Sequence, residues 1–342
     1  MKDKINTIQS KCKIKFSAIC DKRHYSYRIL NLNLINYIKI VRPKNLVIVA
    51  ISQILIYLVY LMPQRERTSI ELDGNLWILF VVDTLLIAAG GYVINDILDQ
   101  KADMLNKPGK LFMGKNGISS VKGWIYYFIL VIIGFAIAFY IASRIDKLLL
   151  LSIYPTAVGF LFLYSKYFKR MPLLGNLVVS LFCAFVPAII WYAEFDMVES
   201  LHSIDPRSYK LIVNVFIAYI LFAFLSTFVR EVIKDIEDVE GDQKSSYQTL
   251  PIQAGIGRAN VVALFFSILL LLSYGFWFTG YIGNQLVYIG LVVLLGLIIP
   301  TCIIIRQIYL AKSQIDYSSI SKRLKYLMIS SLFIFLCIPF MK

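Results

Sequence analysis

Nine stretches of about 20 apolar residues run through the sequence, and they constrain its fold more than any other feature. A helix of this length crosses the hydrocarbon core of a bilayer. Backbone polar groups inside lipid must bond within their own segment, so such stretches are expected to be helical. They lie at roughly 44–62, 76–94, 124–142, 147–165, 173–195, 211–229, 260–280, 284–305 and 324–341. The sequence therefore predicts an all-α, polytopic membrane protein with nine transmembrane helices.

The composition agrees with a membrane protein. Hydrophobic residues make up 58% of the chain and charged residues 16%, and the mean hydropathy is +0.70. A soluble domain averages about 45–50% apolar and about 25% charged residues, so a disordered chain and an ordinary soluble fold are both excluded. The net charge of +14 is typical of cytoplasmic loops in a multi-pass protein. We therefore expect the lipid bilayer, and no nucleic acid, as a partner.

The distribution of Lys and Arg predicts the orientation of the chain. Of the 35 basic residues, 28 lie in the N-terminal region and in the loops on its side of the nine spans. The positive-inside rule places this side, including the N-terminus, in the cytoplasm. Residues 1–40 are predicted to be a basic cytoplasmic tail without a signal peptide, and residues 41–342 the nine-helix domain. The sequence makes no prediction of oligomeric state.

Two acidic motifs with identical spacing follow the second and sixth spans. The first reads Asn95-Asp96-x-x-Asp99-x-x-x-Asp103, and the second reads Asp235-x-x-Asp238-x-x-x-Asp242, with a constant offset of 139 residues. On a helix, positions i, i+3 and i+7 fall within an arc of about 60°. The three carboxylates of each motif are thus expected to share one face, where they repel one another unless a cation lies between them. The motifs form an internal repeat.

Carboxylate oxygens at a membrane surface indicate a magnesium site. Mg²⁺ commonly binds one or two protein carboxylates and completes its shell with water and substrate phosphates. Either motif alone would be explained by solvated loop acids, but two matched motifs favour a metal-bridged diphosphate. Basic partners are then needed for charge balance, although the positive-inside rule also accounts for any single one. The candidates are Lys107, Lys110, Lys166, Lys169, Arg170, Arg230 and Lys234.

With these motifs, the chain resembles the UbiA superfamily of intramembrane prenyltransferases over about 300 residues, from Arg42-Pro43-Lys44-Asn45 onward. The resemblance implies nine helices around a central cavity and Mg²⁺-dependent use of an allylic prenyl diphosphate. It implies that Asp96, Asp99, Asp103, Asp235, Asp238 and Asp242 hold the metal and act in catalysis. It also implies a set of substrate-binding residues, in which Asn95 is an added oxygen ligand of the metal and Tyr164 faces the allylic cation. The set is Asn95, Lys107, Lys166, Lys169, Arg230, Lys234, Tyr164, Arg42 and Asn45.

Within the superfamily, three segments look most like the branch that prenylates geranylgeranylglyceryl phosphate. They are 88–96, Asn106-Lys107-Pro108 and 230–238. The family commonly continues with Arg-Pro where this chain has Gly109-Lys110-Leu111. The expected reaction is transfer of a polyprenyl group to a lipophilic acceptor, with an aromatic quinone precursor as the alternative acceptor. A membrane transporter with an acidic cytoplasmic site is the alternative from another class, since intramembrane polar residues in a repeat are also typical of transporters.

Two further expectations concern the surroundings of the motifs. Segments 95–123 and 230–259 are expected to form a helical cap that excludes water from the site. Asn176 lies inside an apolar span, and polar side chains in such positions often bond across helices. Its partner cannot be named from the sequence.

Overall fold

The computed structural model describes residues 35–106, 113–114, 117–279 and 287–337. Apart from one isolated β-bridge between Met113 and Ile118, the regular structure of these residues is helical. The elements are α2 (Pro43–Ile56), η1 (Tyr57–Leu61), η2 (Met62–Gln64), α3 (Asn75–Asn106), α4 (Ser120–Arg144), α5 (Leu148–Lys166), η3 (Phe168–Arg170), α6 (Leu174–Ala193), α7 (Phe195–Ile204), α8 (Pro206–Glu237), α9 (Val239–Lys244), α10 (Leu250–Ala254), α11 (Ile256–Thr279), α12 (Val287–Val293), η4 (Leu294–Ile298), α13 (Ile299–Leu310) and α14 (Gln314–Cys337).

Eight helices in the described part of the chain are long and apolar enough to cross a membrane. They are Pro43–Gln64, Asn75–Gln100, Ser120–Arg144, Leu148–Arg170, Leu174–Ala193, Pro206–Glu237, Ile256–Gly275 and Gly290–Leu310. Each overlaps one of the first eight predicted spans, which confirms an integral, multi-pass membrane protein. The ninth predicted span, 324–341, falls on α14 and continues into residues outside the described ones. The count of nine therefore stays a prediction, as does the tail at 1–40, most of which also lies outside them.

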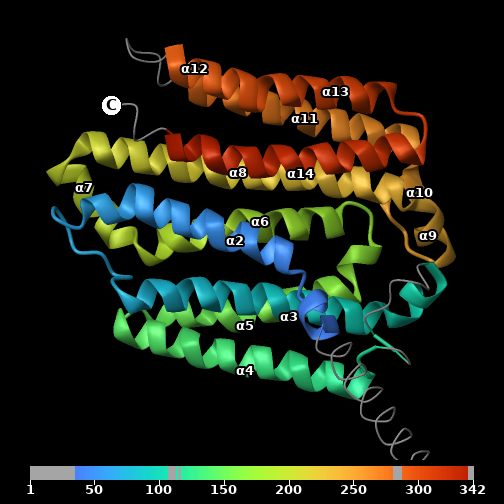
Figure 1. Cartoon of the computed structure of the whole chain (residues 1–342), viewed down its shortest axis with the longest axis horizontal. Coiled ribbons are helices and arrows are strands. Elements are labelled where there is room, and N and C mark those ends of the chain that lie inside the picture. Colours follow the sequence, from blue (N-terminus) through green and yellow to red (C-terminus); the bar gives the residue numbers. More distant parts are fainter. Residues whose placement is uncertain (1–34, 107–112, 115–116, 280–286, 338–342) are drawn as a thin grey trace, which may run out of the picture.

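The long helices lie side by side as a bundle of nearly parallel rods (Figure 1). At one edge α3 packs against α4 and α5, and further across α8 packs against α6, α11 and α14. Helix α2 connects the two groups, because it contacts α3, α6 and α14. The C-terminal parts of α3 and α8, together with α9 and α10, lie at the same end of the bundle (Figure 1). We call this end the motif end.

Helices α3 and α8 extend beyond the apolar stretches that predicted them. Each is 32 residues long, against the 19 residues of the predicted spans 76–94 and 211–229. The added turns of α3 carry the first motif, and those of α8 carry Asp235, as direct continuations of membrane helices. Regular helix geometry, rather than a loop, thus fixes the positions of Asn95, Asp99 and Asp235.

The second motif does not lie on a single helix, so the prediction of one shared face is wrong there. Helix α8 ends at Glu237, Asp238 has a ψ of 7°, and Asp242 belongs to the short helix α9. A ψ near 0° departs from the α-helical value of about −42° and interrupts the helix. Asp is a poor former of helix interiors, and Asp238 occupies this break. The first motif, in contrast, lies entirely within α3.

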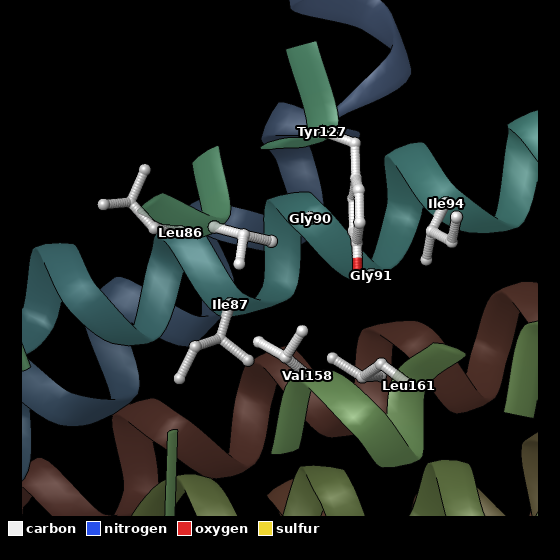
Figure 2. A pocket seen from close by; sticks show the side chains of 9 residues that line it. Leu86, Ile87, Gly90, Gly91, Ile94, Tyr127, Val158 and Leu161 are labelled. Carbon is white, nitrogen blue, oxygen red and sulfur yellow. The ribbon is translucent and has the colours of Figure 1, made fainter. Parts of the chain in front are cut away.

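Two glycines let α3 pack closely against its neighbours. Gly90 and Gly91 line a narrow apolar crevice between α3, α4 and α5, toward which Tyr127 and Leu161 point (Figure 2). A β-carbon on Gly91 would lie 3.1 Å from a methyl group of Leu161, which is tighter than ordinary contact. This packing sets the distance between α3 and α5 one turn from Asn95. The crevice lies off to one side of the bundle, and the central cavity stays a prediction.

Candidate active site

Asp99 is the centre of a contact network at the motif end. Its Oδ1 accepts hydrogen bonds from the ammonium of Lys169 and from the hydroxyl of Tyr247, the latter at 2.8 Å. The same ammonium donates to Oδ1 of Asn95 at 3.1 Å. The Lys169 and Asp99 side chains are 8% and 14% exposed, so this ion pair is shielded from water. Helix α3, η3 and the segment after α9 thus meet at one carboxylate.

Asp96 is paired with a residue at the start of α2. The guanidinium of Arg42 donates to Oδ1 of Asp96 at 3.0 Å and lies 4.8 Å from the centre of the Tyr92 ring. Arg42 has φ 53°, a left-handed conformation that costs a non-glycine residue about 1–2 kcal/mol. It also precedes Pro43, which fixes the first turn of α2. The ion pair and the ring contact hold Arg42 in this uncommon conformation and fix its charge beside the first motif.

The second motif is held by partners from other elements. Asn176 of α6 donates to Oδ2 of Asp235 at 2.8 Å, which confirms that Asn176 bonds across helices. Thr249 donates to Oδ2 of Asp242 at 3.5 Å, from the segment between α9 and α10. One turn earlier in α8, Arg230 donates to Glu231 at 2.6 Å. Asp235 and Asp242 therefore each accept a hydrogen bond from another segment of the chain, one from an amide and one from a hydroxyl.

A group of basic residues gathers next to the motifs from three helices. Lys325 of α14 donates to Oδ1 of Asn45 at 3.2 Å, and the charges of Arg230 and Lys44 lie close enough to repel its ammonium. The Nε of Arg230 is buried and has no hydrogen-bond partner in the described part of the chain. Like charges drawn together around an unsatisfied donor favour the binding of an anion. We call Lys44, Arg230 and Lys325 the basic group.

Tyr164 lies near the motifs, at the end of α5. It is half-buried near the end of α5, within electrostatic range of Asp99, Asp235 and Glu231. Its part in the site stays a prediction. Asn45 connects α2 to two other helices at the motif end. Its amide donates to the Tyr92 hydroxyl at 3.3 Å, and its Oδ1 accepts from Lys325.

Two predicted residues are not brought into this network by the contacts seen, and two others cannot be placed in it because they lie wholly or partly outside the described residues. The ammonium of Lys166 faces the rings of Phe162 and Tyr167 instead, at 5.8 and 5.0 Å. Lys234 lies beside Asp235 in the sequence of α8 without a direct bond to it. Lys107 lies outside the described residues. Asp103 continues the backbone of α3, but its side chain is also outside the described part.

The donor set suits a hard cation, although it is not assembled into a complete metal site. Among the described side chains, no three of His, Cys, Asp or Glu lie together as metal ligands would. Two oxygens one helical turn apart, on Asn95 and Asp99, nevertheless converge on one cation, the Lys169 ammonium. Oxygen donors of this kind are those that Mg²⁺ binds. The residues of the first motif therefore fit the predicted ion.

Sequence reasoning missed two residues of the site, Tyr247 and Lys325. Tyr247 follows the second motif by five residues, and nothing in its spacing connects it to Asp99. Lys325 was counted among the basic loop residues, and only the packing of α14 against α2 and α8 brings it to Asn45. Asn176 carried a usable signal, since an amide inside an apolar span needs a partner.

The fold and site together define a multi-pass membrane protein in which several helices gather acidic and basic side chains at one end. The sequence profile described as the UbiA prenyltransferase family matches residues 47–329. The chain belongs to the UbiA prenyltransferase family and is a prenyltransferase. This membership excludes the transporter alternative as the primary assignment.

Relatives and solved structures agree with the family. The chain is 32% identical to the digeranylgeranylglyceryl phosphate synthase of Saccharolobus solfataricus over 264 residues, 77% of this chain and 83% of the relative. It is 28% identical to the enzyme of the same name from Sulfurisphaera tokodaii, over 86% of this chain and 94% of the relative. The fold is similar to a solved digeranylgeranylglyceryl phosphate synthase structure, with a TM-score of 0.61 at 22% identity over 89% of this chain and 97% of the other. A UbiA homologue from Archaeoglobus fulgidus bound to DMAPP and Mg²⁺ aligns with a TM-score of 0.55 at 16% identity, over 86% and 98%.

Proposed function

We propose that this prenyltransferase transfers a geranylgeranyl group from its diphosphate to geranylgeranylglyceryl phosphate, a lipid acceptor. The observation that carries the proposal is that basic side chains bond acids of the first motif, Lys169 to Asp99 and Arg42 to Asp96, at the end of the bundle where the second motif also lies (Figure 1). A site with both acidic and basic side chains suits an anionic substrate that binds together with a metal ion, as a prenyl diphosphate does. The relatives named as digeranylgeranylglyceryl phosphate synthases support the choice of acceptor.

The metal would be held by the two motifs. Asp96, Asp99, Asp103, Asp235, Asp238 and Asp242 are the proposed carboxylate ligands, and Asn95 adds an amide oxygen. Mg²⁺ bound there would neutralise the diphosphate and stabilise the charge that builds on it as the C–O bond breaks. The Archaeoglobus fulgidus homologue binds DMAPP together with Mg²⁺, which supports this assignment.

The other site residues have separate roles in the proposed reaction. Arg230 and Lys325 donate to the departing diphosphate, while Lys169 leaves its bond with Asp99 to do the same. The acceptor hydroxyl oxygen forms a bond to the prenyl carbon as the C–O bond to the diphosphate breaks. The diphosphate leaves with the electron pair, and the hydroxyl proton passes to it. The face of Tyr164 stabilises positive charge on the prenyl group. Helices α9 and α10 and the segment between them exclude water that would otherwise react with that group.

The orientation follows from the charge distribution. We propose that the motif end faces the cytoplasm, with the N-terminus on the same side, because most Lys and Arg lie there. The prenyl chains then lie along the apolar helices, within the bilayer, while the diphosphate stays at the rim.

An acceptor panel tests this function. The purified protein in vesicles receives geranylgeranyl diphosphate, Mg²⁺ and either geranylgeranylglyceryl phosphate or an aromatic quinone precursor, and products are identified by mass. We expect the glyceryl phosphate lipid to gain one geranylgeranyl unit. Transfer to the aromatic acceptor alone would contradict the proposal and support an aromatic prenyltransferase.

A further inference from the structure

Three basic residues lie close together at the junction of α5 and α6, but they face different surroundings. Lys169 is buried and bonded to Asp99. Lys166 and Arg170 are exposed and line an open pocket of about 480 Å³. The other lining residues are Leu98, Tyr167 and Met171. The junction thus supplies one lysine to the acidic motif and two cations to a separate pocket beside it.

The charges of this pocket are not neutralised within the described part of the chain. The Lys166 ammonium has only the faces of Phe162 and Tyr167 near it. The Arg170 guanidinium lies 5.3 Å from the centre of the Tyr247 ring, and no described carboxylate pairs with either residue. Two cations at one opening, with hydrogen-bond donors left over, recognise a phosphate group well, and Arg can do so with two parallel bonds.

The remaining wall of the pocket is apolar. Tyr167 and Met171 are 46% and 44% exposed, and Leu98 completes this wall from α3. The pocket lies where the membrane helix α5 ends. A ligand that uses both walls carries an anionic head and a hydrocarbon chain. A free anion would leave the apolar wall uncovered.

The pocket is directly connected to the first acidic motif. Arg170 stacks on Tyr247, whose hydroxyl donates to Asp99 at 2.8 Å. The backbone N–H of Gln248 donates to the carbonyl of Arg170 at 3.0 Å. A phosphate bound by Arg170 therefore lies one aromatic ring away from the carboxylate assigned to the donor diphosphate. The two anionic groups would then lie next to each other at the same end of the bundle.

We propose that this pocket, formed by Leu98, Lys166, Tyr167, Arg170 and Met171, binds the phosphate group of the lipid acceptor. The inference rests on the proposed function, because it takes the acceptor to be a phosphate-bearing lipid. It separates the basic residues by substrate: Lys169 and the basic group serve the donor diphosphate, and Lys166 and Arg170 serve the acceptor phosphate.

Equilibrium binding without metal and without prenyl diphosphate tests the pocket independently of catalysis. Radiolabelled geranylgeranylglyceryl phosphate is titrated with the protein in phosphatidylcholine vesicles, and the uncharged lipid geranylgeranylglycerol serves as the matched ligand. We expect Lys166→Gln and Arg170→Gln each to weaken binding of the phosphate lipid about tenfold, as for loss of one charge-assisted hydrogen bond. Binding of the uncharged lipid should not change. Lys122→Gln removes an exposed charge at the start of α4, at the same end, and should leave both affinities unchanged.

Several outcomes would overturn the assignment. One is that both variants bind the phosphate lipid as tightly as the wild type does. Another is that they lose affinity for the uncharged lipid to the same extent, which would indicate damaged packing. If phosphatidylglycerol competes as well as geranylgeranylglyceryl phosphate does, the pocket is a general site for anionic lipids. If inorganic phosphate at the same concentration displaces the lipid, the pocket is a site for a free anion. Lys166 is exposed, so Lys166→Gln keeps the test valid if the Arg170 variant unfolds. If no transfer activity is found yet the phosphate lipid binds as expected, the pocket stands and only the proposed reaction fails.

Discussion

The hydroxyl of Tyr247 lies 2.8 Å from Oδ1 of Asp99, across 148 positions of sequence. This bond connects the first acidic motif in α3 to the segment that follows the second motif. Because Asp99 also accepts from Lys169, its carboxylate is held by donors from two elements. One oxygen atom of Asp99 thus connects the first motif with the segment after the second motif.

Removing the Tyr247 hydroxyl should weaken the metal site without destroying it. Tyr247→Phe deletes the bond to Asp99 but keeps the ring under Arg170, and one such bond contributes about 1 kcal/mol. We expect a roughly fivefold rise in the Mg²⁺ concentration needed for half-maximal transfer. Tyr247→Ala, which also removes the ring, should have a larger effect. A Mg²⁺ dependence identical to wild type in both variants would show that the bond does not position Asp99.

Lys169 should stabilise the protein mainly when no metal is bound. Lys169→Met removes the cation between Asn95 and Asp99 and leaves a shielded carboxylate without its ion pair, a loss of about 3–5 kcal/mol for a fully buried pair. We expect thermal stability in detergent to fall, and added Mg²⁺ to raise the Tm of the variant by more than that of the wild type. If Mg²⁺ raised the Tm of both proteins equally, the Lys169 ammonium and Mg²⁺ would not share one position. Lys122→Met is the matched control, since Lys122 is exposed.

Three glycines in membrane helices should respond differently to substitution by alanine. A β-carbon on Gly134 would lie 2.2 Å from the Tyr154 hydroxyl, one on Gly91 would lie 3.1 Å from Leu161, and Gly159 has nothing within 4 Å. Gly134→Ala is expected to destabilise by about 1–3 kcal/mol because it overfills a packed contact. Gly91→Ala should have a smaller effect, and Gly159→Ala should be neutral or stabilising. Thermal unfolding of the three variants measures this order, and the reverse order would contradict the packing of α3, α4 and α5.

A buried carboxylate at the opposite end should make stability depend on pH. Glu194 is 0% exposed and accepts the N–H groups of Glu71 and Leu72, and burial raises the pKa of its side chain. The folded state therefore holds a proton more tightly than the unfolded state, whose glutamate has a pKa of about 4.3. Stability should decline as pH rises from that value through the raised pKa of the folded state. Glu194→Gln should remove this part of the slope in Tm against pH, and an unchanged slope would exclude Glu194 as its source.

Hydropathy predicted most of the fold, because inside a bilayer the backbone N–H and C=O groups of a chain can be hydrogen-bonded in few ways other than a helix. Eight of the predicted spans coincide with helices of sufficient length and apolarity. Hydropathy did not predict the full lengths of α3 and α8, since the polar turns at their ends lie beyond the apolar spans. The break at Asp238 depends on backbone angles that periodicity does not reveal.

The spacing of the acids predicted where the site lies, but not how it is held. The matched motifs identified Asp99 and Asp235 as site residues, and the structure connects each to a donor from a different element. Lys166 and Lys169 are equivalent by sequence, three residues apart in one basic junction, yet only Lys169 turns toward Asp99. Contacts between distant segments, such as Tyr247 with Asp99, depend on how the helices pack, and no local pattern encodes them.

The most direct test of the site is release of diphosphate from geranylgeranyl diphosphate, measured with Mg²⁺, the acceptor and three variants in vesicles. If both motifs hold the metal and the diphosphate, Asp99→Ala and Asp238→Ala will each abolish release while the protein still inserts into the membrane. Asp316→Asn, at an exposed acid at the start of α14, will retain wild-type release. Near-normal release by both motif variants would contradict the account.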